Sequence, residues 1–231
     1  MCAAETTSTL FKEAAAQAQL RSAVYLMLSR VLLYPGPGVE ESWQQGMAAL
    51  EALGGDGGWQ GLVLPQDLPE EWVLTFTHSC PKDCPPYETE YDARSAFQQT
   101  HRLARLGGFY RAFGLAAAQG ERLDHIGVEL EFMHFLTCKE EYAWLHLGEE
   151  KASLCRSAQR RFLEEHLGRW APLFWRLLEK RGGFYAGLAR ASRGFLEQEA
   201  PRLGAHTSPL DEEAFTPLPE PSFPEGGCGE A

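Results

Sequence analysis

The sequence predicts an all-α protein: a single-domain helical bundle with an extended C-terminal tail. Apolar residues recur at helical spacing in one segment after another, and glycines or prolines separate these segments. No segment alternates convincingly between apolar and polar residues over five or more positions, so a sheet has little support. At 231 residues, 44% hydrophobic and 23% charged, the chain is long enough for one substantial core.

The first part of the chain contains three expected helices. Residues 9–34 keep apolar side chains at helical spacing, and the PGPG stretch at 35–38 ends this long helix. Residues 39–53 predict a shorter amphipathic helix, which the glycines of GGDGG at 54–58 stop. The run PEE at 69–71 marks a third helix start, because proline is favoured in the first turn and acids are favourable near the positive end of the helix dipole.

The second part is also helical until about residue 200. Further helices are expected at 93–114, 124–147, 149–167, 170–181 and 184–200. From Pro201 onward prolines and acids accumulate, which is typical of a segment without a core of its own. We therefore expect a helical domain at residues 1–200 and a flexible tail at 201–231.

Charge and motif content exclude several classes of function. The formal net charge of −11 argues against general binding of nucleic acid and suits a basic partner, although simple solubility explains it equally well. No signal-peptide pattern and no membrane-length apolar run is present, so we expect a cytoplasmic protein without membrane insertion. Nucleotide-binding, nucleophile-elbow and zincin motifs are missing, and no resident cofactor is expected.

The stretch LDHIGVELEFMHF at 123–135 is the most informative helix. Asp124 is expected to cap it, because a short carboxylate can accept the free N–H groups of a first helical turn. The helix is apolar on nearly all sides, which places it inside a bundle and leaves Glu129 in apolar company. His125, one turn earlier, is the expected partner of Glu129. Asp124 and His125 form either a cap with a local ion pair, which spacing alone favours, or part of a binding surface.

Glu131 and His134 form an ExxH motif, the pattern of carboxylate-bridged di-iron bundles. Such sites need two ExxH motifs and two further glutamates. No second ExxH exists in this sequence, so a di-iron site is not expected.

His78, Cys80 and Cys84 form a candidate metal site. Thiolates and imidazole suit zinc, yet the spacing is CxxxC and no second pair follows. Three interpretations remain open: a metal site, a reversible disulfide, and no special chemistry, which is the commonest outcome.

Two prolines at 85–86 follow this cysteine pair and hold the chain extended. Tyr87, Glu88, Glu90 and Tyr91 then line a stiff segment before the next helix. Aromatic rings and acids on a stiff segment suit the capture of a basic peptide.

Three motifs in order resemble one known family. These are Glu71-Trp72 with Phe76, the segment PPYETEY at 85–91, and DHIGVELEFM at 124–133. Over about residues 10–200 the chain resembles the TorD/DmsD/NarJ family of molybdoenzyme assembly chaperones, also called redox enzyme maturation proteins. The CxxxC is not a general feature of that family. It resembles the cysteine-bearing loop of members that are similar to the delta subunits of nitrate-reductase-type enzymes.

The resemblance implies an all-helical, non-enzymatic chaperone in the cytoplasm. Its partner would be the catalytic subunit of a molybdopterin-containing oxidoreductase, or the twin-arginine signal peptide of that subunit, held until the cofactor is inserted. In the family the Asp-His pair and the preceding aromatic helix are implicated in leader binding, which here means Asp124, His125, Trp72 and Phe76. Leu123 stands where the family often has proline.

The residue chemistry fits such a partner independently. The arginines of a leader would pair with Glu88, Glu90 or Asp124, because the guanidinium fork matches a carboxylate. The apolar part of the leader would lie against Trp72 and Phe76. We expect Tyr87, Tyr91 and Glu129 to complete this site, in a protein that is a monomer or homodimer. The alternative function is a thiol-based metal-binding or redox protein centred on Cys80 and Cys84.

Overall fold

The computed structural model describes residues 2–54, 58–78, 83–92, 95–116 and 122–215. Helices account for the regular structure of these residues, whose β structure is an isolated antiparallel bridge between Tyr87 and His125. The expected all-α class is therefore confirmed. No helix in the described ranges is long and apolar enough to cross a membrane.

The helices follow the predicted segments closely. In chain order the α-helices are α1 (Cys2–Leu32), α2 (Val39–Ala52), α3 (Leu68–Val73), α4 (Thr89–Asp92), α5 (Ala96–Ala112), α6 (Ile126–His146), α7 (Glu149–Phe162), α8 (Gly168–Glu179) and α9 (Gly183–Leu203). One π-helical segment, Leu74–His78, continues α3, and another, Leu163–Leu167, joins α7 to α8. A short 3-10 helix spans Glu212–Ala214. The sequence did not predict α4 or the π-helical segments.

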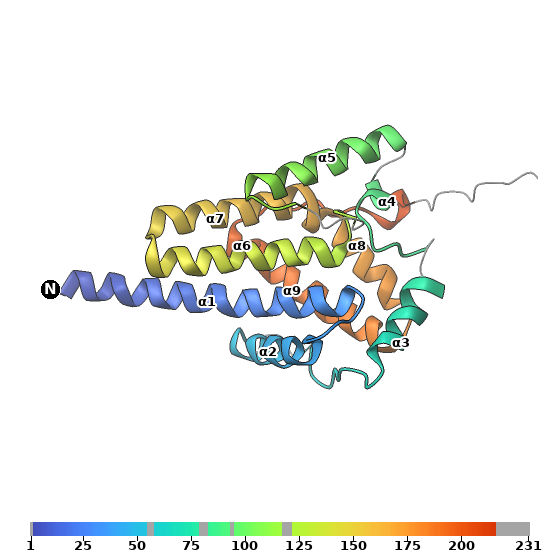
Figure 1. Ribbon diagram of the computed structural model, residues 1–231, viewed down its shortest axis with the longest axis horizontal. Coiled ribbons are helices and arrows are strands. Elements are labelled where there is room, and N and C mark those ends of the chain that lie inside the picture. Colours follow the sequence, from blue (N-terminus) through green and yellow to red (C-terminus); the bar gives the residue numbers. More distant parts are fainter. Residues whose placement is uncertain (1, 55–57, 79–82, 93–94, 117–121, 216–231) are drawn as a thin grey trace, which may run out of the picture.

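Helix α6 lies in the middle of the bundle, as its apolar circumference predicts. It packs against α1 on one side and α7 on another, while α2 flanks α1 and α8 pairs with α9 (Figure 1). The largest fully buried side chains are Trp170, Trp175, Tyr25, Tyr185, Phe162 and Phe174. Burial of each large apolar side chain contributes roughly 1.5–3 kcal/mol to folding.

A buried polar network crosses the core between α1, α6, α7 and α9. The Arg21 Nε donates to both carboxylate oxygens of Glu199, over 2.9 and 2.8 Å, and Arg21 Nη1 donates to Glu140 over 2.9 Å. Gln159 donates to the same Glu140 carboxylate over 2.8 Å, and Tyr25 donates to Glu199 over 3.0 Å. All five side chains are buried, so these partners replace the water that each charge gives up.

The folded body extends past the expected domain boundary at residue 200. Helix α9 continues to Leu203, and the chain from 204 to 215 follows it along the bundle. The Phe215 ring stacks on Tyr91, with ring centroids 4.9 Å apart. Residues 201–215 thus belong to the body rather than to a separate tail, because apolar side chains in this segment find partners in the core. Residues 216–231 lie outside the described part of the chain.

Candidate peptide-binding site

The PPYETEY segment is attached directly to the start of α6. The Ile126 amide donates a hydrogen bond to the Pro86 carbonyl, and the Glu88 amide donates to the Asp124 carbonyl, each over 2.9 Å. These bonds satisfy backbone groups that the prolines and the helix end would otherwise leave free. Two motifs more than thirty residues apart in the sequence therefore form one structural unit.

His125, not Asp124, caps α6. The Nδ1 atom of His125 accepts a hydrogen bond from the Gly127 amide over 3.0 Å, and the His125 backbone is extended. The predicted Asp124 cap is wrong because the Asp124 carboxylate is engaged elsewhere. Burial lowers the pKa of His125 to about 4, so the ring is neutral at pH 7 and carries its proton on Nε2. The ring meets the Tyr87 ring edge to face, with centroids 5.3 Å apart.

The Asp124 carboxylate binds two partners at once. It accepts from the Thr89 amide over 3.2 Å and from the Thr89 hydroxyl over 2.7 Å. It also accepts from Arg122, over 3.0 Å from Nε and 2.8 Å from Nη2. Burial opposes ionisation of Asp124, but the hydrogen bonds from Arg122 and Thr89 outweigh it and lower the pKa of the carboxyl below its usual value. Asp124 is thus a buried anion that ties α4 to the start of α6.

Arg122 is a residue of this site that the sequence motifs did not identify. Its guanidinium carbon lies 3.8 Å from the centroid of the Tyr87 ring, and its Nη1 lies 3.4 Å from Glu90. One signal could have found it: a buried carboxylate needs a cation, and Arg122 stands two positions before Asp124. Tyr87 and Glu90 therefore face a guanidinium that belongs to this chain itself.

Glu129 does not pair with His125, contrary to the sequence-based expectation. Its carboxyl accepts from the Trp170 indole N–H over 3.1 and 3.2 Å. Complete burial, together with the neighbouring Glu88 charge, holds the pKa of Glu129 well above its usual range. A protonated Glu129 can donate to Glu88, because two carboxyl groups share a hydrogen bond only when one carries a proton.

Glu88 and Tyr91 also face the interior rather than solvent. Glu88 accepts from Nδ1 of the buried His166 over 2.9 Å. The Tyr91 ring packs between Phe215 and Trp170, whose centroids lie 4.9 and 5.3 Å away. Glu88, Tyr91 and Glu129 thus fix the segment on the bundle and are not open to a partner in this conformation.

The predicted aromatic pair forms a second part of the candidate site. The Trp72 indole N–H donates to the Leu32 carbonyl at the end of α1 over 3.0 Å, and the Trp72 ring lies between Tyr34 and Phe76. Phe76 is buried, whereas Tyr34 is 62% exposed and Leu74 is 52% exposed. Trp72, Tyr34 and Leu74 therefore present apolar area at the surface, and Tyr34 was not foreseen as part of it.

The end of α1 joins the two parts. Leu33 packs directly over Gly127: a Cβ atom on Gly127 would lie 2.6 Å from the Leu33 Cγ. Glycine in the DHIG motif is therefore required by the close approach of α1. Since Leu33 lies between the Trp72 contact at Leu32 and the capped end of α6, all three motifs meet at one end of the bundle.

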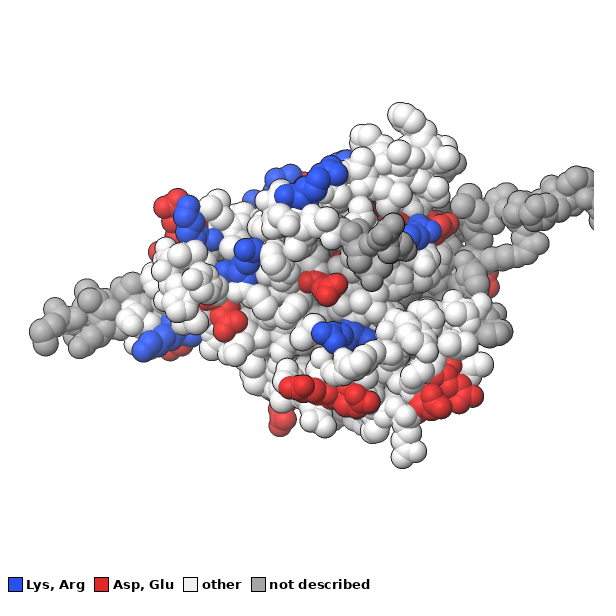
Figure 2. All heavy atoms as spheres, in the orientation of Figure 1, with Lys and Arg blue, Asp and Glu red and all other residues white. Residues whose placement is uncertain are grey.

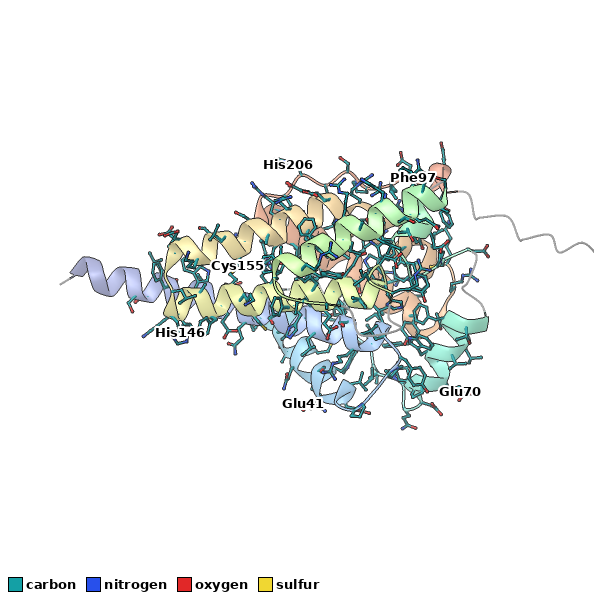
Figure 3. All side chains as sticks on the ribbon, turned by 45° about the horizontal axis from the view of Figure 1, so that its top comes forward. Glu41, Glu70, Phe97, His146, Cys155 and His206 are labelled. Atoms are coloured by element: carbon teal, nitrogen blue, oxygen red, sulfur yellow. The ribbon has the colours of Figure 1, made fainter. Side chains whose placement is uncertain are left out.

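Acidic side chains surround the aromatic part. In Figure 2 acidic groups gather over α2 and α3, while basic groups lie mainly over α5 and α7. Figure 3 shows Glu41 on α2 and Glu70 on α3 pointing outward along the same edge. Glu40, in the first turn of α2, is likewise exposed. This edge combines apolar and acidic groups, the pair of properties that a basic and apolar peptide needs.

The cysteine pair is described only in part. Cys80 and the His78 side chain lie outside the described atoms. Cys84 is completely buried, with its Sγ 3.6 Å from the Phe174 carbonyl oxygen. Within the described ranges no group of three or more His, Cys, Asp or Glu side chains is arranged to hold a metal ion.

Comparison with known proteins agrees with the motif order. Similar proteins include a perchlorate reductase assembly chaperone protein from Dechloromonas aromatica, 48% identical over 81 residues, covering 33% of this chain and 35% of that protein. A selenate reductase assembly chaperone protein from Thauera selenatis is 37% identical over 111 residues, covering 44% and 56%. The matches thus span between one third and just over half of these relatives.

A crystal structure from Archaeoglobus fulgidus, assigned as a redox enzyme maturation protein, is similar with a TM-score of 0.46 and 25% identity, covering 77% of this chain and 93% of that one. The family model described as nitrate reductase delta subunit matches residues 38–176, which include all three motifs. The family-model match and the two reductase assembly chaperones confirm the resemblance drawn from the motifs, and the chain belongs to the nitrate reductase delta subunit family.

Proposed function

We propose that this protein is a cytoplasmic assembly chaperone, not an enzyme, for a molybdopterin-containing oxidoreductase. It binds the catalytic subunit, through the N-terminal leader or N-terminal region of that subunit, while the cofactor is inserted. The relatives named as assembly chaperones of perchlorate and selenate reductases support this class of partner.

The observation that carries the proposal is the meeting of the three motifs at one end of the bundle. Backbone hydrogen bonds join Pro86 to Ile126, Leu33 covers Gly127, and Trp72 bonds to the end of α1. A rigid frame of this kind keeps the shape of a binding surface fixed before the partner arrives, which lowers the entropy lost on binding.

The surface chemistry fits a segment that is basic at one end and apolar at the other. The apolar part would lie against Tyr34, Trp72 and Leu74, where ring and side-chain area is exposed. The basic part would face the acids of α2 and α3 (Figure 2) and Glu90, which is 26% exposed. Because a flexible peptide must be ordered on binding, micromolar affinity is expected.

Affinity purification from the native cytosol tests the proposal. The tagged protein should retain the catalytic subunit of an oxidoreductase, and metal analysis of that subunit should show it lacking molybdenum. The proposal would be contradicted if the tagged protein retained no oxidoreductase subunit under any growth condition that induces such enzymes.

Surface variants locate the binding face. Replacing two exposed side chains together, Tyr34→Ser with Leu74→Ser, should weaken retention at least tenfold, because both remove apolar contact area. Phe97→Ser is the matched control: Phe97 is 81% exposed and lies on α5, at the edge opposite Glu70 (Figure 3). Equal losses in the two variants would contradict the assigned face.

Metal analysis distinguishes the proposed chaperone function from the alternative, a thiol-based metal-binding protein. Stoichiometric zinc or iron in protein purified without chelators, lost in a Cys80→Ser, Cys84→Ser variant, would support a thiol-based metal protein. The buried Cys84 thiol gives that alternative no support.

A further inference from the structure

Arg122 lies in a site that has the geometry of an arginine-binding site. The Asp124 carboxylate receives two roughly parallel N–H bonds from the guanidinium, over 3.0 and 2.8 Å. The Tyr87 ring covers the guanidinium at 3.8 Å, and Glu90 and the Thr89 hydroxyl complete the surroundings at 3.4 and 3.0 Å. A paired carboxylate with an aromatic face is the arrangement that distinguishes arginine from lysine.

The residues that bind the Arg122 guanidinium are held in place by contacts that do not involve Arg122. Asp124 is completely buried and held by two hydrogen bonds from Thr89, and Tyr87 is held by its bridge to His125. Arg122, in contrast, is 42% exposed. The acceptor is fixed and the cation reaches solvent, so exchange of one guanidinium for another needs no rearrangement of the acceptor.

The two other buried acids of the three motifs do not offer such a place. Glu88 is bonded to the buried His166, and Glu129 is bonded to the Trp170 indole in the core. An incoming arginine would have to open the core to reach Glu129, and it would have to compete with His166 for Glu88. Glu88 also has Arg102 at 3.7 Å, and 21% of the Arg102 side chain is exposed. Among these three buried carboxylates, Asp124 is the one that pairs with a guanidinium through two hydrogen bonds of 3.0 Å or less, and that guanidinium belongs to a side chain that is 42% exposed.

We propose that Arg122 is an internal placeholder: it closes the arginine site in the free protein, and an arginine of the client segment replaces it on binding. The identity of the client rests on the proposed function above, but the site does not. Arginine alone can replace Arg122 without losing contacts of the acceptor, because the newcomer restores both N–H bonds to Asp124 and the stacking on Tyr87, while the rest of the client segment supplies the binding free energy. A lysine restores neither the paired bonds nor the planar stacking.

Removal of the placeholder gives a test that needs no client. Arg122→Ala should bind N-acetyl-arginine amide, and its Tm should rise by about 3–5 °C at ten times the Kd of this probe. N-acetyl-lysine amide at the same concentration should leave the Tm unchanged. The wild-type protein should respond to neither compound, because Arg122 already fills the site.

Arg161→Ala is the matched control variant. Arg161 also binds a carboxylate, that of Glu165, over 3.1 and 3.2 Å and lies over an aromatic ring, that of Phe109, at 5.4 Å. Glu165 keeps a second cation, Arg105 at 2.8 Å, so removal of Arg161 leaves no vacant site. This variant should show no response to the arginine probe.

The response of Arg122→Ala to the two probes decides the proposal. An Arg122→Ala protein that is folded and insensitive to the arginine probe, or equally sensitive to the lysine probe, overturns the proposal. If Arg122→Ala is unfolded without ligand, recovery of its helical circular dichroism with the arginine probe supports the proposal, and no recovery overturns it. An added Asp124→Asn change should abolish the response in either case.

A peptide comparison connects the site to binding. The peptide acetyl-Ala-Arg-Arg-Ala-amide should bind Arg122→Ala at least tenfold more tightly than wild type, and the dilysine peptide should show no such gain. If the peptides behave in this way but no oxidoreductase subunit is retained from cytosol, the proposed function fails and the placeholder stands. If wild type retains the subunit and Arg122→Ala shows no gain, the placeholder fails alone.

Discussion

The Nδ1 atom of His125 accepts the Gly127 amide hydrogen over 3.0 Å, which makes a neutral imidazole the N-cap of α6. A protonated ring would have no lone pair at Nδ1 for this bond. The cap therefore depends on pH, and it lies at the centre of the unit that joins the PPYETEY and DHIG motifs.

Acidification should destabilise the protein through His125. The ordinary pKa of 6.5 is lowered to about 4 in the fold, chiefly by burial, so the unfolded chain takes up a proton between these values while the folded one does not. The free energy of unfolding should thus fall as the pH decreases from 6.5 to 4, by at most about 3 kcal/mol from this group. Denaturant unfolding of wild type and His125→Asn across that range isolates this contribution, since asparagine caps without titrating. Parallel pH profiles would contradict it.

Glu129→Gln should stabilise the protein at neutral and alkaline pH. The folded-state pKa of Glu129 is raised, so the stability linked to its protonated form is complete below the ordinary value of 4.5 and is lost as the pH rises toward the folded value, at up to ~1.4 kcal/mol per pH unit. Glutamine keeps the acceptor for Trp170 and a donor toward Glu88 without this loss. The advantage over wild type should grow as the pH rises above 4.5, as measured by urea unfolding at a series of pH values. Glu131→Gln, on the exposed face of the same helix, is the matched control, and equal pH profiles for the two variants would contradict the prediction.

Arg21→Ala should cost about 3–5 kcal/mol of stability, because it leaves the buried carboxylates of Glu140 and Glu199 without their shared cation. Equilibrium urea unfolding followed by circular dichroism measures this loss. Arg30→Ala on the same helix removes a single exposed hydrogen bond to the Pro37 carbonyl and should change stability by less than about 1 kcal/mol. Similar losses in the two variants would show that the buried network contributes little.

Gly127→Ala should cost about 1–3 kcal/mol through overpacking against Leu33, whose Cγ would lie 2.6 Å from the new methyl group. Adding Leu33→Ala should recover part of this loss, so a double-mutant cycle should give a favourable coupling energy. Gly108→Ala is the control: it lies within α5, where a methyl group meets no atom within 4 Å, and it should stabilise by roughly 0.5–1 kcal/mol. Additive losses at 127 and 33 would rule out the direct contact.

The sequence motifs predicted the ends of the helices well, because glycine and proline act locally. The PGPG stretch separates α1 from α2 as expected, and Gly182 lies between α8 and α9. The same local signals predicted the domain boundary at residue 200 less well. Prolines after residue 200 resemble a tail in sequence, but Pro201 stays within α9 and Phe215 finds Tyr91 in the body. Stacking between residues so far apart in the chain leaves no local pattern.

The site shows the same division. Sequence alone identified DHIG as a helix start, yet Asp124 and His125 are adjacent and each is able to cap, so only the tertiary partners of Asp124 decide between them. The partner of Glu129 proved to be Trp170, 41 positions away, rather than the histidine one turn earlier. For a fully buried carboxyl, the whole packed interior competes with nearby residues.

The sequence by itself determined the all-α class, the helix boundaries and the family, since each rests on short-range periodicity or on motif order. Only the tertiary structure decided which acids of those motifs reach the surface, and that Arg122 is the cation paired with Asp124. The physical reason is that burial and charge pairing depend on every segment packed around a group, and local sequence specifies few of those neighbours.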